Sequence, residues 1–318
     1  MTTPRTECTL SFHGAAANSC PHSLKWVHCP TAAIYDNTDN EACVSEADEE
    51  VLIYPSSGAI NLAITADTPT VTTVIQTLIT QSQPHVGGEK KVLARGEAVE
   101  DAAALRSVTA LDWLDCRADA DCVSGKQCGI VAAFSDGTLT SWRFRSSWKE
   151  YLLIGTADGP THADVRNVDD ESLRESIADV SAVPLTPSCW LVATASSSGV
   201  LLVLSNIEEN GKEGVWIRQI THHSAASVRI IHNKLNNECL IFVGSASPRH
   251  NKIWVYTLPI SLTTNAADKE STKRASLWTI IPNKLNVHEP EYHGCLLGHQ
   301  DWITCFSWID ALNCPSSS

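Results

Sequence analysis

The sequence lacks long apolar runs and amphipathic helical periodicity, and each absence excludes a class of protein. No stretch approaches the roughly 18 apolar residues that a membrane-spanning helix needs. The opening residues, MTTPRTECTLSF, lack the apolar core of a secretory signal peptide. Apolar residues do not recur at helical spacing, which disfavours a helical protein. We therefore expect a soluble, β-rich protein of the cytoplasm, with the nucleus as a second location.

Positive charge is also scarce. The chain has 23 Lys and Arg residues against 36 Asp and Glu residues, a formal net charge of −13 at pH 7. A surface with this balance repels phosphate backbones and anionic lipids. The most basic stretch, EKKVLARG at 89–96, is diluted by acidic neighbours. Direct binding to nucleic acid or to a membrane is therefore not expected as the main function.

Cysteines are numerous but scattered, which is typical of free, buried thiols in a reducing compartment. Two groups hold enough ligand types to suggest a metal: Cys20, His22, His28 and Cys29, and the evenly spaced Cys116, Cys122 and Cys128 with Asp115, Asp119 and Asp121. The first group has the wrong spacing for metal knuckles, and a strand would place His28 and Cys29 on opposite faces. The second group lacks the Gly and terminal Glu of a calcium loop. We expect no metal and no cofactor.

Catalytic patterns are absent as well. The pair His222 and His223 has no nucleophile elbow and no suitably placed carboxylate. The stretch GTADGPTHAD at 155–164 has neither the Lys nor the following helix of a phosphate loop. We therefore expect no catalytic residue and a protein that is not an enzyme. The acidic stretch at 164–180 has mild helical spacing and is interpreted as a solvated insertion, with docking of a basic partner as the alternative.

The sequence does contain a series of short apolar strands separated by turns. Strands are predicted at 50–55 and 58–64, and GIVAAFSDGTLTSWRF at 129–144 predicts the clearest hairpin, in which Asp136 and Gly137 supply the positive φ of a two-residue turn. The stretches at 189–205 and 239–256 repeat this shape. Large residues close the four units at corresponding positions, namely Tyr54, Trp142, Leu204 and Tyr256.

A further strand carrying Trp or Val precedes each hairpin: SLKWVHC at 23–29, SVTALDWL at 107–114, ASVRIIH at 226–232 and, for a unit not completed, DWITCFSWID at 301–310. A repeat of about 40 to 45 residues with variable insertions is typical of propeller blades. Each blade is a four-stranded sheet that stacks on its neighbours around an axis, because it cannot bury both faces alone.

The sequence thus predicts an all-β, WD40-type β-propeller that is incomplete, with about four blades and the first strand of a fifth. An N-terminal extension occupies 1–17 and the partial propeller 18–318. The predicted blades are 18–66, 105–150, 181–207 and 214–260, the next begins at 293–310, and the insertions are 67–104, 151–180 and 261–292.

Residues of the WD40 motif are present but dispersed. In a complete blade, the His of a Gly-His turn, a hydroxyl, an Asp of the hairpin turn and a Trp share hydrogen bonds, so that their buried polar groups are satisfied. No blade here has the whole set, which indicates degenerate repeats. The residues that match the motif are Asp136, Gly137, Trp142, Gly298, His299, Asp301 and Trp302.

Three stretches resemble the WD40 subunit of the Elongator complex. CPHSLKW at 20–26 is similar to the opening of its first blade, VTALDW at 108–113 to its second inner strand, and LLGHQDWITCFSW at 296–308 to the opening of its fifth blade, with Gln300 in place of the usual Glu. The resemblance covers nearly all of this chain but well under half of that protein. We therefore expect a truncated product or a fragment of a longer protein.

This resemblance implies a non-catalytic scaffold. In Elongator, which modifies the wobble uridine of certain tRNAs, the chemistry belongs to another subunit. The WD40 subunit bridges the large scaffold subunit and the catalytic, acetyltransferase-like subunit, so tRNA would be met only indirectly. A WD40 adaptor of another complex, in ubiquitin ligation or trafficking, is the alternative, and a propeller enzyme is the weaker rival.

Overall fold

The computed structural model describes fourteen segments of the chain, and they contain strands and turns but no helix. These segments are 24–30, 48–56, 59–65, 72–79, 107–115, 128–144, 147–155, 175–186, 188–207, 213–246, 252–262, 276–280, 285–299 and 303–306. The prediction of an all-β chain is therefore confirmed for this part of the protein. None of the described residues forms a helix long and apolar enough to cross a membrane.

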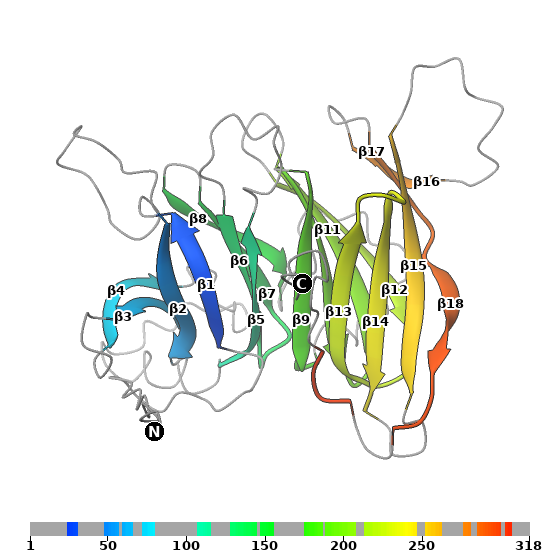
Figure 1. Ribbon diagram of the computed structural model, residues 1–318, viewed down its shortest axis with the longest axis horizontal. Coiled ribbons are helices and arrows are strands. Elements are labelled where there is room, and N and C mark those ends of the chain that lie inside the picture. The colour runs from blue at the N-terminus through cyan, green and yellow to red at the C-terminus, as the bar shows by residue number, and fades with distance from the viewer. Residues whose placement is uncertain are drawn as a thin grey trace, which may run out of the picture.

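The strands form four antiparallel sheets that follow one another along the chain (Figure 1). The first sheet contains β1 (Lys25–Pro30), β2 (Asp48–Ser56), β3 (Ala59–Thr65) and β4 (Thr72–Ile79). The second contains β5 (Val108–Asp115), β6 (Cys128–Phe134), β7 (Leu139–Phe144) and β8 (Trp148–Ile154). The third contains β9 (Asp179–Thr186), β10 (Cys189–Ser196), β11 (Gly199–Ile207) and β12 (Glu213–Thr221).

The fourth sheet is larger than the others. It contains β13 (Ala225–Asn233), β14 (Glu238–Ser245), β15 (Ile253–Leu262) and β18 (Glu291–Leu296), paired in that order. The long strand β15 continues beyond this core and also pairs with β17 (Leu285–His288), which pairs in turn with β16 (Ser276–Ile280). In the first three sheets consecutive strands are neighbours, as expected of strands joined by turns.

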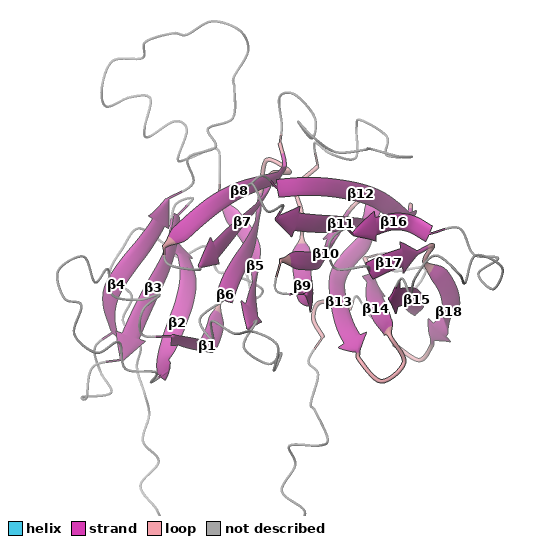
Figure 2. Cartoon of the chain, turned by 90° about the horizontal axis from the view of Figure 1, so that it is seen from above, coloured by secondary structure: helices cyan, strands magenta, loops and turns pink. Residues whose placement is uncertain are grey.

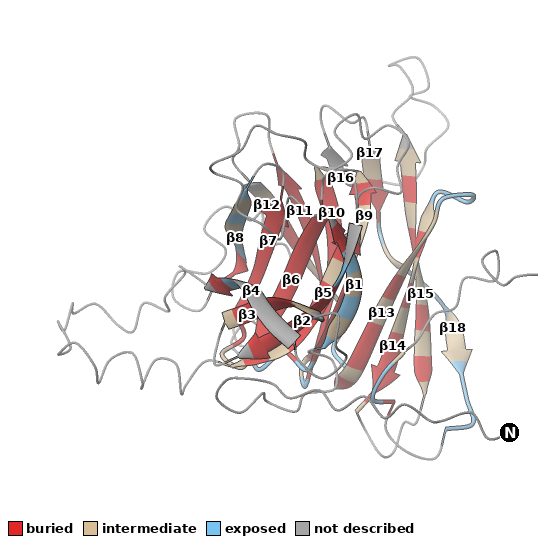
Figure 3. Ribbon diagram, turned by 60° about the vertical axis from the view of Figure 1, so that its left-hand side comes forward, coloured by how far each residue is buried: buried red, intermediate tan, exposed pale blue. Residues whose placement is uncertain are grey.

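Successive sheets stack face to face with an apolar layer between them. One core cluster joins the first and second sheets, another the second and third, and another the third and fourth. Along β10 the alternation decides which layer a residue enters: Trp190 and Val192 face the second sheet, whereas Leu191 and Ala193 face the fourth. Because both faces are covered, all residues of β6, β10 and β11 are buried (Figure 3). Their sequences are therefore nearly continuous apolar runs.

The first strands of the four sheets lie next to one another. β1 contacts β5, β5 contacts β9, and β9 contacts β13. Viewed from above, the sheets extend outward from this line of strands and follow one another along an arc (Figure 2). The first strands therefore share one edge of the molecule.

The strands predicted between residues 23 and 256 are confirmed, but the strands at the outer ends of the sheets correct the expected blade limits. β4 lies within 67–104 and β16 and β17 lie within 261–292, ranges interpreted as insertions, and β12 belongs to the third sheet although 214–260 was assigned to the next blade. β18 completes the fourth sheet instead of opening a fifth blade. Most of these strands lie at a sheet edge, where polar residues dilute the apolar pattern, as in β18.

Three finer expectations also need correction. The turn after Phe134 is a three-residue loop and not the expected two-residue turn. The Phe134 amide donates to the carbonyl oxygen of Thr138 (2.9 Å), and the Gly137 amide donates to the carbonyl oxygen of Phe134 (3.1 Å). Tyr54 lies on the second strand of its sheet, whereas Trp142, Leu204 and Tyr256 lie on third strands. Residues 303–306, expected within a strand, are not in one. The N-terminal extension 1–17 lies outside the described residues.

Candidate functional site

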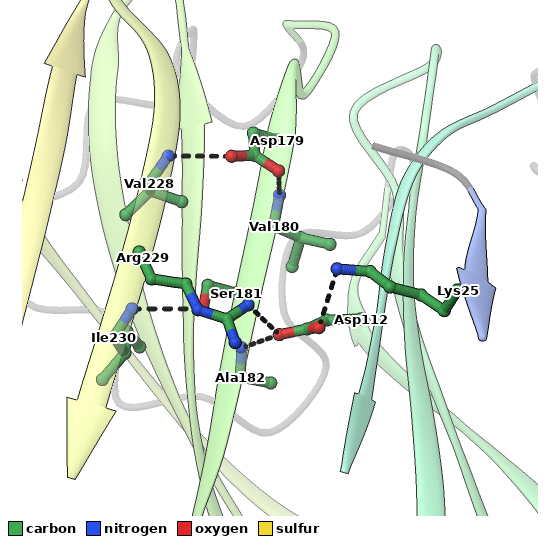
Figure 4. Close-up of polar contacts among 9 residues, drawn as sticks. All are labelled: Lys25, Asp112, Asp179, Val180, Ser181, Ala182, Val228, Arg229 and Ile230. Carbon is green, nitrogen blue, oxygen red and sulfur yellow. Dashed lines mark hydrogen bonds and ion pairs between the residues drawn. The ribbon is translucent and has the colours of Figure 1, made fainter. Parts of the chain in front are cut away.

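The adjacent first strands are tied together by side chains that bond to the backbone of the next strand (Figure 4). The Ala182 amide on β9 donates to Oδ2 of Asp112 on β5 (2.9 Å). The Val228 amide on β13 donates to Oδ2 of Asp179 on β9 (2.9 Å). The Ile230 amide donates to Oγ of Ser181 (3.1 Å). A first strand has a free edge, and these side chains satisfy amides that no strand pairs with.

The same arrangement continues past β13. The Ser227 hydroxyl donates to the carbonyl oxygen of Ile303 (2.6 Å), and the Ile303 amide donates to Ser245 O (3.4 Å). Ile303 is buried, and a Cβ at Gly244 would press against its side chain. The phenyl rings of Phe242 and Phe306 lie 6.4 Å apart. The segment 303–306 therefore begins to cover the outer face of the fourth sheet, beside its first strand.

Asp112 is the centre of this line. Its carboxylate is almost fully buried and receives Lys25 Nζ at 3.1 Å from Oδ1 and Arg229 NH1 at 3.5 Å from Oδ2, in addition to the Ala182 amide. The contacts come from β1, β9 and β13, so one carboxylate on β5 joins all four first strands. Figure 4 shows Lys25 and Arg229 reaching it from opposite sides. We define Lys25, Asp112 and Arg229 as the first-strand triad.

The triad is unevenly exposed. The Asp112 side chain retains 6% of its surface, against 29% for Lys25 and 35% for Arg229. A carboxylate this buried depends on its partners, because an unpaired charge in such a place is costly. About a third of each cationic side chain, in contrast, is open to solvent. The triad is therefore both a tie between sheets and the one clustered charge feature that the described first strands present.

The predicted WD40 residues fall in two places. Asp136 and Gly137 lie in the β6–β7 turn, where the Thr138 amide donates to Asp136 Oδ1 (2.9 Å) and Gly137 takes a φ of 81°. Trp142 lies on β7, buried in the layer between the first and second sheets. Gly298 has a φ of 114° and His299 is exposed, both after β18. Asp301 and Trp302 lie outside the described residues.

The other candidate residues do not assemble into a site. His28 is exposed and Cys29 buried, as the alternation of β1 predicts, and Cys20 and His22 lie outside the described residues. Cys128 is buried at the start of β6, and the described residues contain no group of three or more potential metal ligands. His222 and His223 are exposed between β12 and β13, where the ring of His223 stacks on Trp254 with a centroid separation of 5.2 Å.

The C-terminal end of the acidic stretch 164–180 is buried, although a solvated insertion was expected there. Ile177 has a buried side chain in the layer between the second and third sheets, and Asp179 is buried on the first strand β9. The end of 164–180 is therefore part of the fold and not a solvated helix, whereas Val168 and Leu173 lie outside the described residues.

Sequence reasoning missed the triad. Its visible signal is Asp112, an acidic residue between Leu111 and Trp113 in the middle of a first strand. The partners could not be read from the sequence, because Lys25 and Arg229 are 87 positions before and 117 positions after Asp112. Comparison with known proteins adds no partner or role: no family model matches the chain, and no curated protein matches it.

Proposed function

We propose that this chain is the stacked, blade-forming part of a WD40-type β-propeller and that it acts as a non-catalytic scaffold. One observation carries the proposal. Four consecutive antiparallel sheets share core layers face to face, and their first strands lie side by side along one edge. In a propeller, inner strands line the axis and sheets radiate from it. The Asp136–Gly137 turn and the buried Trp142 support the WD40 type.

The scaffold role follows from what such a body offers. Rigid stacked sheets hold loops and sheet rims in fixed positions, and these surfaces bind other proteins. The acidic balance of the chain disfavours direct tRNA contact. On the resemblance of residues 20–26, 108–113 and 296–308, we propose the Elongator complex as the assembly, with its large scaffold subunit and its catalytic subunit as partners, in the cytoplasm and the nucleus.

Affinity purification with mass spectrometry tests this proposal. The tagged chain is expressed in cells of its source, and we expect other Elongator subunits to co-purify with it. Recovery of ubiquitin-ligase or coat subunits in their place would favour the alternative adaptor roles and overturn the assignment to Elongator.

A matched control bait distinguishes partners that bind the folded chain from proteins that adhere to it nonspecifically. Trp190 is buried between the second and third sheets. Replacing it with Ala leaves a cavity in that layer and lowers the free energy of unfolding by about 3–5 kcal/mol. The surface residues of this variant are unchanged. If partners bind the stacked sheets, Trp190→Ala recovers much less of them; equal recovery by both baits would contradict a scaffold role for the fold.

A further inference from the structure

The first-strand triad contains two positive charges and one negative charge. Two cations, Lys25 and Arg229, share the single carboxylate of Asp112, at N–O distances of 3.1 and 3.5 Å. No other ion pair of either cation occurs within the described segments. The triad therefore has a net charge of +1 in a chain whose formal net charge is −13.

The donors of the triad are also only partly used. An ammonium has three N–H donors and a guanidinium five. Asp112 accepts one contact from each, and the longer of them, from Arg229, is at the limit of hydrogen-bond distance. The Nε atom of Arg229 is buried and has no hydrogen-bond partner within the part of the chain that is described. A buried donor without a partner is energetically unfavourable, so Asp112 does not fully satisfy the guanidinium of Arg229.

We propose that Lys25 and Arg229 form an anion-binding site, anchored by Asp112, that takes a carboxylate side chain of a partner protein. The two cations flank Asp112, and about a third of each side chain remains open, so an incoming carboxylate can approach them from solvent. Arg binds carboxylates through paired N–H donors, which gives this contact geometric specificity.

A single carboxylate fits the site better than a polyanion. The site offers one unit of excess charge, whereas the acidic remainder of the chain repels an extended phosphate backbone. That the partner is a protein rests on the proposed scaffold function; the anion site itself rests on the triad alone. Its position on the first strands places the contact at the shared edge of all four sheets.

The test measures binding to the purified chain directly, independently of co-purification. The chain is labelled with ¹⁵N-arginine, and the Nε–H resonance of Arg229 is assigned by its loss in Arg229→Gln. We expect this resonance to shift on titration with N-acetyl-Gly-Glu-Gly amide and not with the matching Gln peptide. An unmoved resonance, or equal shifts with both peptides, would overturn the proposal.

Charge variants then separate binding from stability. Lys25→Gln is expected to weaken the Glu peptide about tenfold, because it removes one of two cations, whereas Lys149→Gln, at an exposed lysine on β8, leaves it unchanged. Asp112→Asn removes the competing carboxylate and is expected to tighten binding several-fold wherever the variant still melts cooperatively. If the triad is purely structural, Lys25→Gln will leave binding of the Glu peptide unchanged and Asp112→Asn will not tighten it.

Two further outcomes decide the ligand class. The first is a competition experiment, in which inorganic phosphate, a short RNA and acetate each displace the Glu peptide. If phosphate or RNA acts at a lower concentration than acetate, the ligand is a phosphate and the carboxylate assignment is overturned. If co-purification fails but the Glu peptide binds as expected, the anion site stands and the Elongator assignment falls. If the peptide fails and co-purification succeeds, the opposite holds.

Discussion

Arg143 on β7 lies over the indole of Trp190 on β10, with its guanidinium carbon 3.6 Å from the ring centroid. Its NH1 donates to the carbonyl oxygen of Ser188 (3.0 Å), and NH2 donates to both the carbonyl and the hydroxyl oxygen of Ser205. One buried cation from the second sheet thereby bonds to the backbone and side chains of the third. The stacking of these sheets thus depends on a polar clamp as well as on apolar packing.

This clamp predicts a large loss of stability when it is removed. Arg143→Ala deletes a desolvated cation–π contact and charge-assisted hydrogen bonds, and we expect the free energy of unfolding to fall by about 3–4 kcal/mol. Chemical denaturation measures this. Lys149→Ala, on the neighbouring strand but exposed, is the control and should stay within about 0.5 kcal/mol of the parent. Equal effects of the two variants would contradict the clamp.

Gly129 on β6, the register partner of Arg143, lies against the same indole. A Cβ at position 129 would overlap the six-membered ring of Trp190. Gly129→Ala should therefore destabilise the chain by about 1–3 kcal/mol through overpacking. In a Trp190→Leu background that overlap is relieved, and we expect the added cost of Gly129→Ala to fall by at least about 1 kcal/mol. A double-mutant cycle without coupling would show that the two residues do not compete for space.

Two glycines with positive φ offer a matched comparison. Gly199 has a φ of 129°, and its Cβ would overlap the backbone carbonyl of Thr221, whereas Gly298 has a φ of 114° with open space around it. Gly298→Ala should cost only the conformational strain, about 1–2 kcal/mol. Gly199→Ala adds a clash with a backbone that cannot rotate away, so we expect a cost above about 3 kcal/mol. Thermal melting of both variants measures the difference, and equal shifts would contradict the steric account.

The strands could be predicted where burial on both faces made the sequence continuously apolar. The hairpins β6–β7 and β10–β11 are examples, and the sequence placed both correctly. Strands at the outer edge, such as β4 and β18, were missed because half of an edge strand faces solvent and its pattern is diluted by polar residues. The apolar pattern therefore indicates the inside of the stack and not its rim.

The candidate site was harder to predict because its members act across strands that are remote in sequence. Asp136 and Gly137 were found from a local turn pattern, which needs only adjacent residues. Asp112, by contrast, gains its role from Lys25 and Arg229, which approach only when four sheets are stacked. A charged residue in an apolar first strand signals such a contact, but its partners follow from the fold alone.

The thiol of Cys239 makes stability depend on pH. Burial, with smaller contributions from Glu238 and Cys189, raises the pKa of this thiol well above its ordinary value. The raised pKa means that the folded chain keeps Cys239 protonated, whereas the unfolded chain releases the proton above pH ~8.5. The stabilisation is therefore fully present below that pH and is lost as pH rises towards the folded pKa, by up to about 1.4 kcal/mol per pH unit.

Cys239→Ala isolates this effect from the other titrating groups. We expect the difference in unfolding free energy between the parent and Cys239→Ala, measured in urea with a reductant, to be constant from pH 7 to 8. Above pH ~8.5 the parent should lose stability relative to the variant, because only the parent ionises a thiol at position 239 on unfolding. Cys305→Ala is the control, since Cys305 is exposed and Cys239 buried, and it should follow the parent at every pH. A parent and a Cys239→Ala variant with parallel pH profiles up to pH 10 would show that this thiol is accessible to water in the folded chain, and hence that the layer between the third and fourth sheets is not closed.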